Sequence, residues 1–201
     1  FFLAARTEAA SQDARLALAQ VREGSLKFRL GLLTSRFRAH HPLKACPVCN
    51  EEDAATHGWT YWHRTHQLPG VWMCSRHASP LQVSTLKSTG VSRFGWVLPH
   101  SADLNPTAVA SADDSSKEAL QRFSALAAQW GNVPSGSLES STLARTYRMR
   151  MEVLGLDGHR VKLASAYCET IAALRIAPDL CALPGQAREA VHSINRWVFA
   201  P

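Results

Sequence analysis

The 201-residue sequence lacks the features that would place it in a membrane or on a secretory route. It contains no apolar run long enough to span a bilayer and no signal peptide. It has only five cysteines, an odd number, and Cys168 and Cys181 lie in helical-looking apolar surroundings. This distribution does not suit a disulfide framework and is typical of a reducing cytosol. We therefore expect a cytoplasmic protein without membrane contact.

The chain also lacks an internal repeat, an initiator methionine and the composition of a disordered protein. Hydrophobic residues make up 46% of the sequence, which is enough for a packed core. The length fits one large domain or two small ones. Because the chain starts at Phe1 and stops abruptly at Pro201, we expect it to be a piece of a longer protein.

Four metal-ligating side chains stand in two pairs with the same spacing. The sequence Cys46-Pro47-Val48-Cys49 is followed, after 24 residues, by Cys74-Ser75-Arg76-His77. Two turns of this kind can direct four ligands at one point, as a tetrahedral zinc site requires. All four positions are filled, which predicts a structural zinc without an open place for a catalytic water. Buried thiols or a redox pair would account for the first pair only.

The positive charge of the chain is concentrated in the half that holds this motif. The net charge is +6; residues 1–100 carry 12 Lys and Arg against 6 Asp and Glu, and residues 101–201 carry 10 of each. A basic excess beside a zinc module suggests nucleic acid as a partner, through phosphate neutralisation. On charge alone, a solvated basic face without a partner explains the excess equally well.

The fold class that we predict is mainly α, with a small β zinc-ribbon or zinc-knuckle module. Residues 1–43 form an N-terminal helical segment, with one helix over 1–23, whose apolar stripe is Leu16, Leu18 and Val21, and a second from Ser25 to about His41. Residues 44–86 are the zinc module. A short helix begins near Glu51-Glu52-Asp53 and ends at Gly58, and a hairpin pairs residues 60–62 with 71–73 through the turn at 68–70. The module's expected core is aromatic, made by Trp59, Tyr61, Trp62 and Trp72.

The second half is predicted to be a linker or a long ordered connection over 87–116 and a helical domain over 117–201. The composition of the linker is rich in Ser, Thr, Gly, Pro and Asp. Helices are expected over 117–130, capped by Ser115 or Ser116, and then over about 143–154, 163–174 and 186–198. The two middle helices, joined by a glycine turn, could form a helix-turn-helix, although a plain helical bundle is the more common arrangement.

His63, His66 and Gln67 stand between the two cysteine pairs. The spacing of the histidines would suit a second metal or a nuclease centre, but a nuclease also needs carboxylates that hold a metal or a general base. The only local carboxylates are Glu51, Glu52 and Asp53, which look like the start of a surface helix. We therefore favour a structural role, in which these side chains hydrogen-bond around the zinc site.

Residues 29–81 resemble the TniQ/TnsD family of transposon target-site selection proteins. The resemblance is carried by Ala45-Cys46-Pro47-Val48-Cys49, Gly58, Tyr61-Trp62-His63-Arg64, His66-Gln67-Leu68-Pro69-Gly70-Val71, Cys74-Ser75-Arg76-His77 and Leu81, and by Arg29 to Arg36 before them. Beyond residue 100 it rests on helical pattern alone. By resemblance, Cys46, Cys49, Cys74 and His77 match the family's zinc ligands.

The resemblance implies an adaptor that breaks no bond itself. Family members mark the insertion site of Tn7-like transposons, either by reading an attachment site or by joining an RNA-guided CRISPR complex. They pass the signal to an AAA+ ATPase transposition regulator. The implied partners are therefore double-stranded DNA, the AAA+ regulator and, for the RNA-guided members, a CRISPR guide complex, in the cytoplasm at the bacterial nucleoid.

Three functions compete on the sequence. The first is a DNA-binding targeting adaptor, the second a zinc-stabilised protein-interaction module with little DNA contact, and the third, less favoured, a zinc-dependent nuclease. The first predicts phosphate contacts, which position a protein without specifying sequence. The candidate residues are Arg36, Arg38, Lys44, Arg64, Arg76, Arg93, Arg145, Arg148, Arg150, Arg160 and Lys162.

Overall fold

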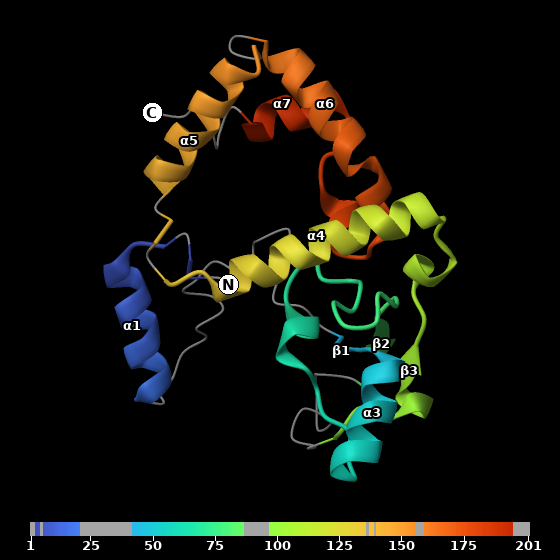
Figure 1. Cartoon of the computed structure of the whole chain (residues 1–201). Helices are drawn as coiled ribbons and strands as arrows, with labels where there is room; N and C mark the ends of the chain where they lie inside the picture. The colour runs from blue at the N-terminus through green and yellow to red at the C-terminus, as the bar shows by residue number, and fades with distance from the viewer. Residues whose placement is uncertain are drawn as a thin grey trace. The chain divides into compact units, whose positions relative to one another are not determined.

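The computed structural model of the chain is mainly helical, with one small sheet, as the sequence predicts (Figure 1). It describes residues 3–4, 6–20, 42–86, 97–135, 137–138, 140–155 and 159–194. The chain forms two compact units. Unit 1 comprises Phe1–Gly31, Asn132–Ala173 and Leu183–Pro201, and unit 2 comprises Leu32–Gly131 and Leu174–Ala182. The predicted second helix and the candidates Arg36, Arg38 and Arg93 lie outside the described residues.

Unit 2 is built on a three-stranded antiparallel sheet in the order β1-β2-β3. The strands are β1 (Lys44–Ala45), β2 (Gln82–Ser84) and β3 (Leu104–Asn105). Lys44 pairs with Val83 on β2, and Val83 in turn pairs with Asn105 on β3. Because β1 runs directly into the first cysteine pair and β2 begins shortly after the second, their pairing brings the two pairs together.

The helix α3 (Pro47–His57) begins inside the first cysteine pair. Cys46 occupies its N-cap and Pro47 its first position, where the missing N–H of proline costs nothing. The helix ends at Gly58, whose φ of +80° is a left-handed conformation that glycine adopts without strain. The predicted helix and its end at Gly58 are confirmed, but it starts earlier than expected, at Pro47.

The predicted hairpin between residues 60–62 and 71–73 is wrong. Its arms bond to other parts of unit 2: the Thr60 hydroxyl donates to the Pro99 carbonyl at 2.7 Å, and the Trp62 indole N–H to the Val97 carbonyl at 2.7 Å. The amides of Trp72 and Met73 both donate to the Ser124 hydroxyl. Between the arms lies the short 3₁₀ helix η1 (Arg64–Gln67). The β-prone residues therefore satisfy their polar groups without pairing to one another.

The aromatic core predicted for the zinc module reduces to one residue. Trp72 is fully buried, whereas Trp59 is 63% exposed, Tyr61 is 40% exposed and Trp62 is half-buried. Trp72 is buried because its indole N–H donates to Asp179 and its ring lies under the Lys44 ammonium, 4.6 Å from the ring centroid. Asp179 belongs to the returning segment Leu174–Ala182 of unit 2, which the local sequence pattern did not connect with this core.

The described part of the predicted linker or ordered connection, residues 97–116, is ordered. It contains the 3₁₀ helices η3 (Ser101–Asp103) and η4 (Ala108–Ser111) as well as β3. Val109 of η4 is fully buried. The strand β3 of this segment pairs with the edge of β2 that β1 does not occupy. Unit 2 contains both residues 97–116 and most of the next helix.

The helix α4 (Asp114–Asn132) covers the predicted helix 117–130 and extends it at both ends. Its cap is Asp113, not Ser115 or Ser116: the Asp113 carboxylate accepts from the Ser116 amide at 2.8 Å and from both serine hydroxyls. The Ser115 hydroxyl bond, before the others, holds the pKa of Asp113 well below its usual value. Gly131, expected just past the end, lies inside the helix, where a Cβ would meet Leu68 at 2.8 Å.

In its described residues, unit 1 contains the helices α1 (Glu8–Ala19), α5 (Ser140–Val153), α6 (Arg160–Ala172) and α7 (Ala187–Ile194). They match the predicted helices, and α5 is followed by Gly155 at a φ of +64°. In α1 the buried residues are Ser11 and Ala14, while the predicted stripe residues Leu16 and Leu18 are exposed. The helices α6 and α7 pack side by side (Figure 1).

Two expectations for unit 1 extend past its described residues. The turn at 156–158, which would join the two helices of a helix-turn-helix, lies outside the described residues. The part of the predicted final helix beyond Ile194 also lies outside them. The helix-turn-helix therefore stays a prediction. Among the helices that the structure describes, none has the length and apolar character needed to cross a bilayer.

Candidate metal centre

The four predicted ligands converge on one point in unit 2. The Nδ1 atom of His77 lies 3.6 Å from the Cys46 sulfur, 3.4 Å from the Cys49 sulfur and 3.6 Å from the Cys74 sulfur. The sulfurs of Cys49 and Cys74 are 3.7 Å apart, and all four ligand atoms lie within 4.8 Å of one another. Zinc bonds of about 2.3 Å to sulfur and 2.0 Å to nitrogen require tetrahedron edges of roughly 3.8 and 3.5 Å. The ligand atoms are therefore already spaced for a tetrahedral ion.

The contacts around the site favour the thiolate of Cys46 and disfavour those of Cys49 and Cys74. A hydrogen bond from the Cys74 thiol lowers the pKa of Cys46 to about 3, and the same bond raises the pKa of Cys74. Burial raises the pKa of Cys49 to about 11. All three cysteines are fully buried, so water does not screen their mutual repulsion. A bound divalent cation would remove this conflict by neutralising the thiolates together.

The second ligand pair is held by backbone bonds of a tight turn. The Ala78 amide donates to the Cys74 carbonyl at 2.9 Å, and the Cys74 amide to the Ser79 carbonyl at 2.8 Å. Ala78 takes a left-handed conformation, with a φ of 49°. An isolated bridge between Met73 and Pro80 closes the base of this turn. The backbone thus returns on itself around the two ligands.

Glu52 fixes the orientation of the histidine ligand. Its carboxylate lies 3.0 Å from His77 Nε2 and 2.6 Å from an Arg76 guanidinium nitrogen. A carboxylate on the far ring nitrogen selects the tautomer that leaves Nδ1 free to bind a metal. We expected Glu51, Glu52 and Asp53 to form only a surface helix start. For Glu52 and Asp53 this is wrong, because the first turns of α3 point them toward the site and toward His63.

His63, His66 and Gln67 form contacts beside the ligands. The Nε2 atom of His63 lies 2.8 Å from the buried Asp53 carboxylate, and the His63 ring stacks on Tyr61 at 4.3 Å between centroids. His66 is 3% exposed, and burial lowers its pKa to about 4. Gln67 pairs with both the amide and the carbonyl of Lys44, at 2.9 and 2.7 Å. Among the described residues, the only cluster with metal-binding geometry is the one at Cys46, Cys49, Cys74 and His77.

Lys44 is not available for the nucleic-acid contact that we predicted. Its side chain is fully buried, and its ammonium donates to the carbonyls of Leu68 and Val71 at 3.0 and 2.5 Å. Burial lowers its pKa to about 8. It closes the loop before the second ligand pair, and the cation faces the Trp72 ring. Sequence reasoning could not detect this role, because the loop carbonyls follow Lys44 by more than twenty residues.

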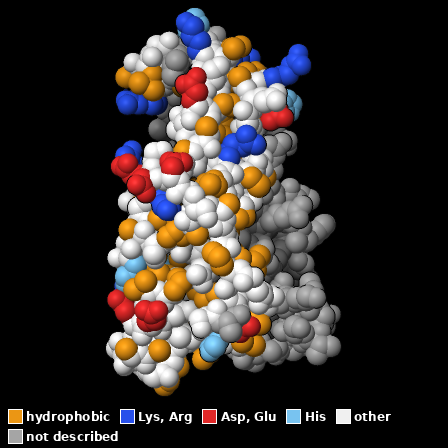
Figure 2. All heavy atoms as spheres, turned by 90° about the vertical axis from the view of Figure 1, so that its right-hand side faces the viewer, with side chains coloured by type: hydrophobic (Ala, Val, Ile, Leu, Met, Phe, Trp, Pro, Cys, Tyr) orange, Lys and Arg blue, Asp and Glu red, His pale blue; other side chains and the backbone are white. Residues whose placement is uncertain are grey.

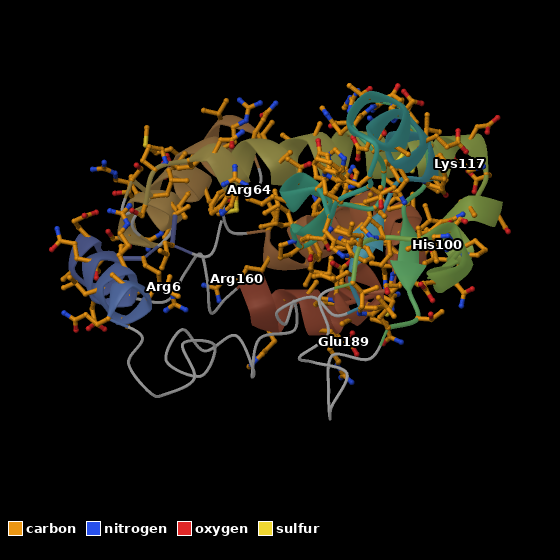
Figure 3. All side chains as sticks on the ribbon, turned by 90° about the horizontal axis from the view of Figure 1, so that it is seen from below. Arg6, Arg64, His100, Lys117, Arg160 and Glu189 are labelled. Atoms are coloured by element: carbon orange, nitrogen blue, oxygen red, sulfur yellow. The ribbon has the colours of Figure 1, made fainter. Side chains whose placement is uncertain are left out.

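The other described basic candidates are exposed. Arg64 lies on η1 and is labelled in Figure 3, while Arg76 pairs with Glu52. In unit 1, Lys and Arg side chains mark the end at which α5 is followed by α6 (Figure 2). The exposed candidates on these two helices are Arg145, Arg148, Arg150, Arg160 and Lys162. The two sets belong to different units, and each is considered as a candidate by itself.

Sequence reasoning missed Ser124 and Asp179, which hold the chain before the second ligand pair. The Ser124 hydroxyl accepts from two consecutive amides, and the Asp179 carboxylate accepts from the Gly70 amide at 2.8 Å and from the Trp72 indole. No local signal marks either residue. Both lie more than fifty residues along the chain from the backbone that they bind.

A comparison with protein families matches residues 3–81 to the TniQ family. The matched segment contains all four ligands and ends four residues after His77. Searches among curated proteins and among solved structures gave no match. The family match thus covers the whole ligand cluster. Over residues 3–81, this chain is therefore similar to the TniQ family.

Proposed function

We propose that this protein is a target-site selection adaptor of a Tn7-like transposon. In this role it binds target DNA, a guide complex or both, and recruits the AAA+ transposition regulator at the bacterial nucleoid. The observation that carries the proposal is the TniQ match over a segment whose two halves meet at a closed four-ligand centre. Such a centre has no open coordination position, which fits an adaptor that breaks no bond.

The proposed metal is a structural Zn²⁺ bound by Cys46, Cys49, Cys74 and His77. Three thiolates and one imidazole in a tetrahedral arrangement are a donor set that zinc prefers. The ion would cross-link the start of α3 to the turn before β2. It would thereby stabilise a unit whose sheet has strands of only two or three residues.

The proposed DNA contacts lie on two basic surfaces. Arg64 and Arg76 form the first, in unit 2, and Arg145, Arg148, Arg150, Arg160 and Lys162 form the second, in unit 1. Exposed Arg and Lys side chains contact phosphates and position a protein on a duplex. Part of the charge on the first surface is neutralised, because Glu52 pairs with Arg76. We therefore expect the larger contribution from α5 and α6.

The second candidate function is a protein-interaction module with little DNA contact. The exposure of Trp59 and Tyr61 favours it, because exposed aromatic side chains frequently anchor protein interfaces. A zinc-dependent nuclease is supported less. The Asp53 carboxylate, which could have served as a base, is buried and paired with His63.

Binding of the zinc-loaded chain to random duplex DNA across a salt series tests the proposal. Phosphate contacts predict affinity that falls steeply as salt rises. Replacing Arg145 and Arg150 together with glutamine should weaken binding to all sequences alike and lower the salt slope by about two. The matched control is Arg122→Gln, which removes an exposed arginine that already pairs with Glu118.

Absence of DNA binding at low salt would favour the interaction module instead. The next measurement would then be capture of the purified AAA+ regulator or a purified guide complex by the zinc-loaded chain. If neither DNA, regulator nor guide complex binds, the adaptor role is wrong even though residues 3–81 match the TniQ family.

A further inference from the structure

Two large aromatic side chains of unit 2, Trp59 and Tyr61, face solvent just after the end of α3. Trp59 is 63% exposed and Tyr61 is 40% exposed. Within the part of the chain that the structure describes, neither the Trp59 indole N–H nor the Tyr61 hydroxyl forms a hydrogen bond. The nearby Trp62 and Trp72 differ, because each of their indole N–H groups donates to an acceptor in unit 2. The fold therefore leaves two aromatic rings open to a ligand.

The exposed Tyr61 ring is held in position by its neighbours. The residues on either side of it bond through their side chains to carbonyls of the segment 97–99, both at 2.7 Å. The Tyr61 ring stacks on the His63 ring with 4.3 Å between centroids, and His63 in turn lies 2.8 Å from the buried Asp53 carboxylate of α3. A ring that is already ordered loses little entropy on binding. Tyr61 therefore presents a preformed surface for stacking.

The charge of the segment that carries these rings favours an anionic ligand. Residues 54–102 contain no Asp or Glu. The carboxylate just before this stretch, Asp53, is buried and paired with His63. Arg64 follows the rings on η1, is exposed, and has no carboxylate partner among the described residues. A chain of phosphates therefore meets an available cation and no repelling carboxylate from this stretch.

Stacking and charge together select the form of the ligand. Exposed aromatic rings also anchor protein interfaces, but a stretch without a single carboxylate suits a partner whose charge is uniformly negative. In a duplex, neighbouring bases cover both faces of each base, so a ring on a protein surface cannot stack on it. Unpaired nucleotides offer free faces, which proteins bind with aromatic rings for the bases and basic side chains for the phosphates. Trp59, Tyr61 and Arg64 supply both kinds of group.

We propose that Trp59 and Tyr61 stack on the bases of an unpaired nucleic-acid strand while Arg64 contacts its phosphates. The proposal rests on the targeting function proposed above and adds an unpaired strand to the duplex as a ligand. Single-stranded DNA and single-stranded RNA share this chemistry, and the test below distinguishes them. Because the larger duplex contribution is expected from α5 and α6, binding of the duplex and binding of the unpaired strand can fail separately.

The test is a fluorescence-anisotropy titration of the zinc-loaded chain at low salt with three labelled strands of about 15 nucleotides, a length that one small domain can cover. The strands are oligothymidine, oligouridine and an abasic strand with the same number of phosphates. Stacking predicts that the abasic strand binds at least about tenfold more weakly than the better of the other two. Tighter binding of oligouridine identifies RNA as the ligand, and tighter binding of oligothymidine identifies DNA. Equal affinity for the abasic strand, or no binding of any strand, would overturn the proposal.

Variants of the two rings assign the binding to this surface. Trp59→Ala and Tyr61→Ala should each weaken binding of the base-bearing strand by about five- to a hundredfold and leave the abasic strand unaffected. Tyr61→Phe keeps the ring and should bind as the unchanged chain does. The control Leu126→Ala truncates a 62% exposed side chain on α4 and should change nothing.

Metal content reports that each variant is folded. Unchanged affinity in Trp59→Ala, or an equal loss for the base-bearing and abasic strands, would refute stacking. Salt-dependent duplex binding that persists beside such a result would leave the targeting function standing and refute this proposal alone.

Discussion

The two ligand pairs have the same spacing in sequence but are built from different backbone structures. Cys46 and Cys49 lie on the first turn of α3, so helical hydrogen bonds hold them. Cys74 and His77 lie on a turn that is closed by the backbone bonds of Ala78 and Ser79. The Ser124 hydroxyl holds the chain just before this turn by accepting from the Trp72 amide. The first pair is therefore a local structure, whereas the second is fixed by residues from another part of unit 2. Spacing alone specifies which atoms can meet and not how the chain holds them.

The difference should appear first when a ligand is removed. Replacing Cys49 with serine should release the metal and unfold unit 2 around residues 44–84, because structural zinc contributes on the order of 10 kcal/mol to folding in small modules. Metal content by atomic absorption and far-ultraviolet circular dichroism would measure both effects. The control is Cys181→Ser, an exposed cysteine outside the cluster. A Cys49→Ser variant that keeps one metal per chain would contradict the ligand assignment.

The dependence of the second pair on α4 is tested at Ser124, whose side chain is buried. Ser124→Ala should lower the free energy of unfolding by about 2–4 kcal/mol, because it leaves the amides of Trp72 and Met73 buried without an acceptor. Urea denaturation of the zinc-loaded chain measures the change.

The matched control for Ser124 is Ser115→Ala on the same helix, since Ser115 is exposed and donates only to the Asp113 carboxylate. It should cost much less. Equal losses for the two serines would mean that the second pair does not rely on α4.

These contrasts explain why part of the site could be predicted from the sequence. The ligand set and the end of α3 at Gly58 follow from short-range rules, which are the ligand spacing and glycine as a helix stop. The start of α3 at Pro47 was not predicted, although proline at the first helical position is itself a short-range signal. Each of these rules operates within about ten residues. The structure agrees with all of them.

The errors arose where long-range partners decided the outcome. The residues around Tyr61 and Trp72 have β propensity, but Val97, Pro99 and Ser124 satisfy their polar groups, so no hairpin forms. A lysine adjacent to the first cysteine pair resembled a phosphate contact, although loop carbonyls bind it in the interior. In both cases the competing partner lies too far along the chain for a local pattern to reveal it.

Removing the Glu52 carboxylate should have a smaller effect on the metal centre than removing a ligand, and the effect should be confined to His77 of the second pair. Glu52→Gln should weaken metal affinity by about 10- to 100-fold, because the carboxylate orients His77 and raises its basicity. Competition with a chromophoric chelator measures the affinity. Glu51→Gln is the matched control, since its side chain contacts no ligand. If both variants bind metal equally, Glu52 is only a surface partner of Arg76.

The smallest effects come from two left-handed residues, Gly58 after α3 and Ala78 after the second ligand pair. Gly58→Ala should lower the free energy of unfolding by about 1 kcal/mol, because alanine is strained at a φ of +80° although nothing lies within 4 Å of its Cβ position. Ala78→Gly should raise it by up to about 1 kcal/mol, since glycine relieves the strain at a φ of 49°.

These changes correspond to shifts of roughly 2–4 °C in the melting temperature, of opposite sign. Differential scanning calorimetry of the zinc-loaded variants resolves shifts of this size. A loss in both variants would show that the second turn requires the Ala78 methyl group for packing. The strain in that turn would then be offset by a contact, and the two ligand pairs would differ in side-chain packing as well as in backbone.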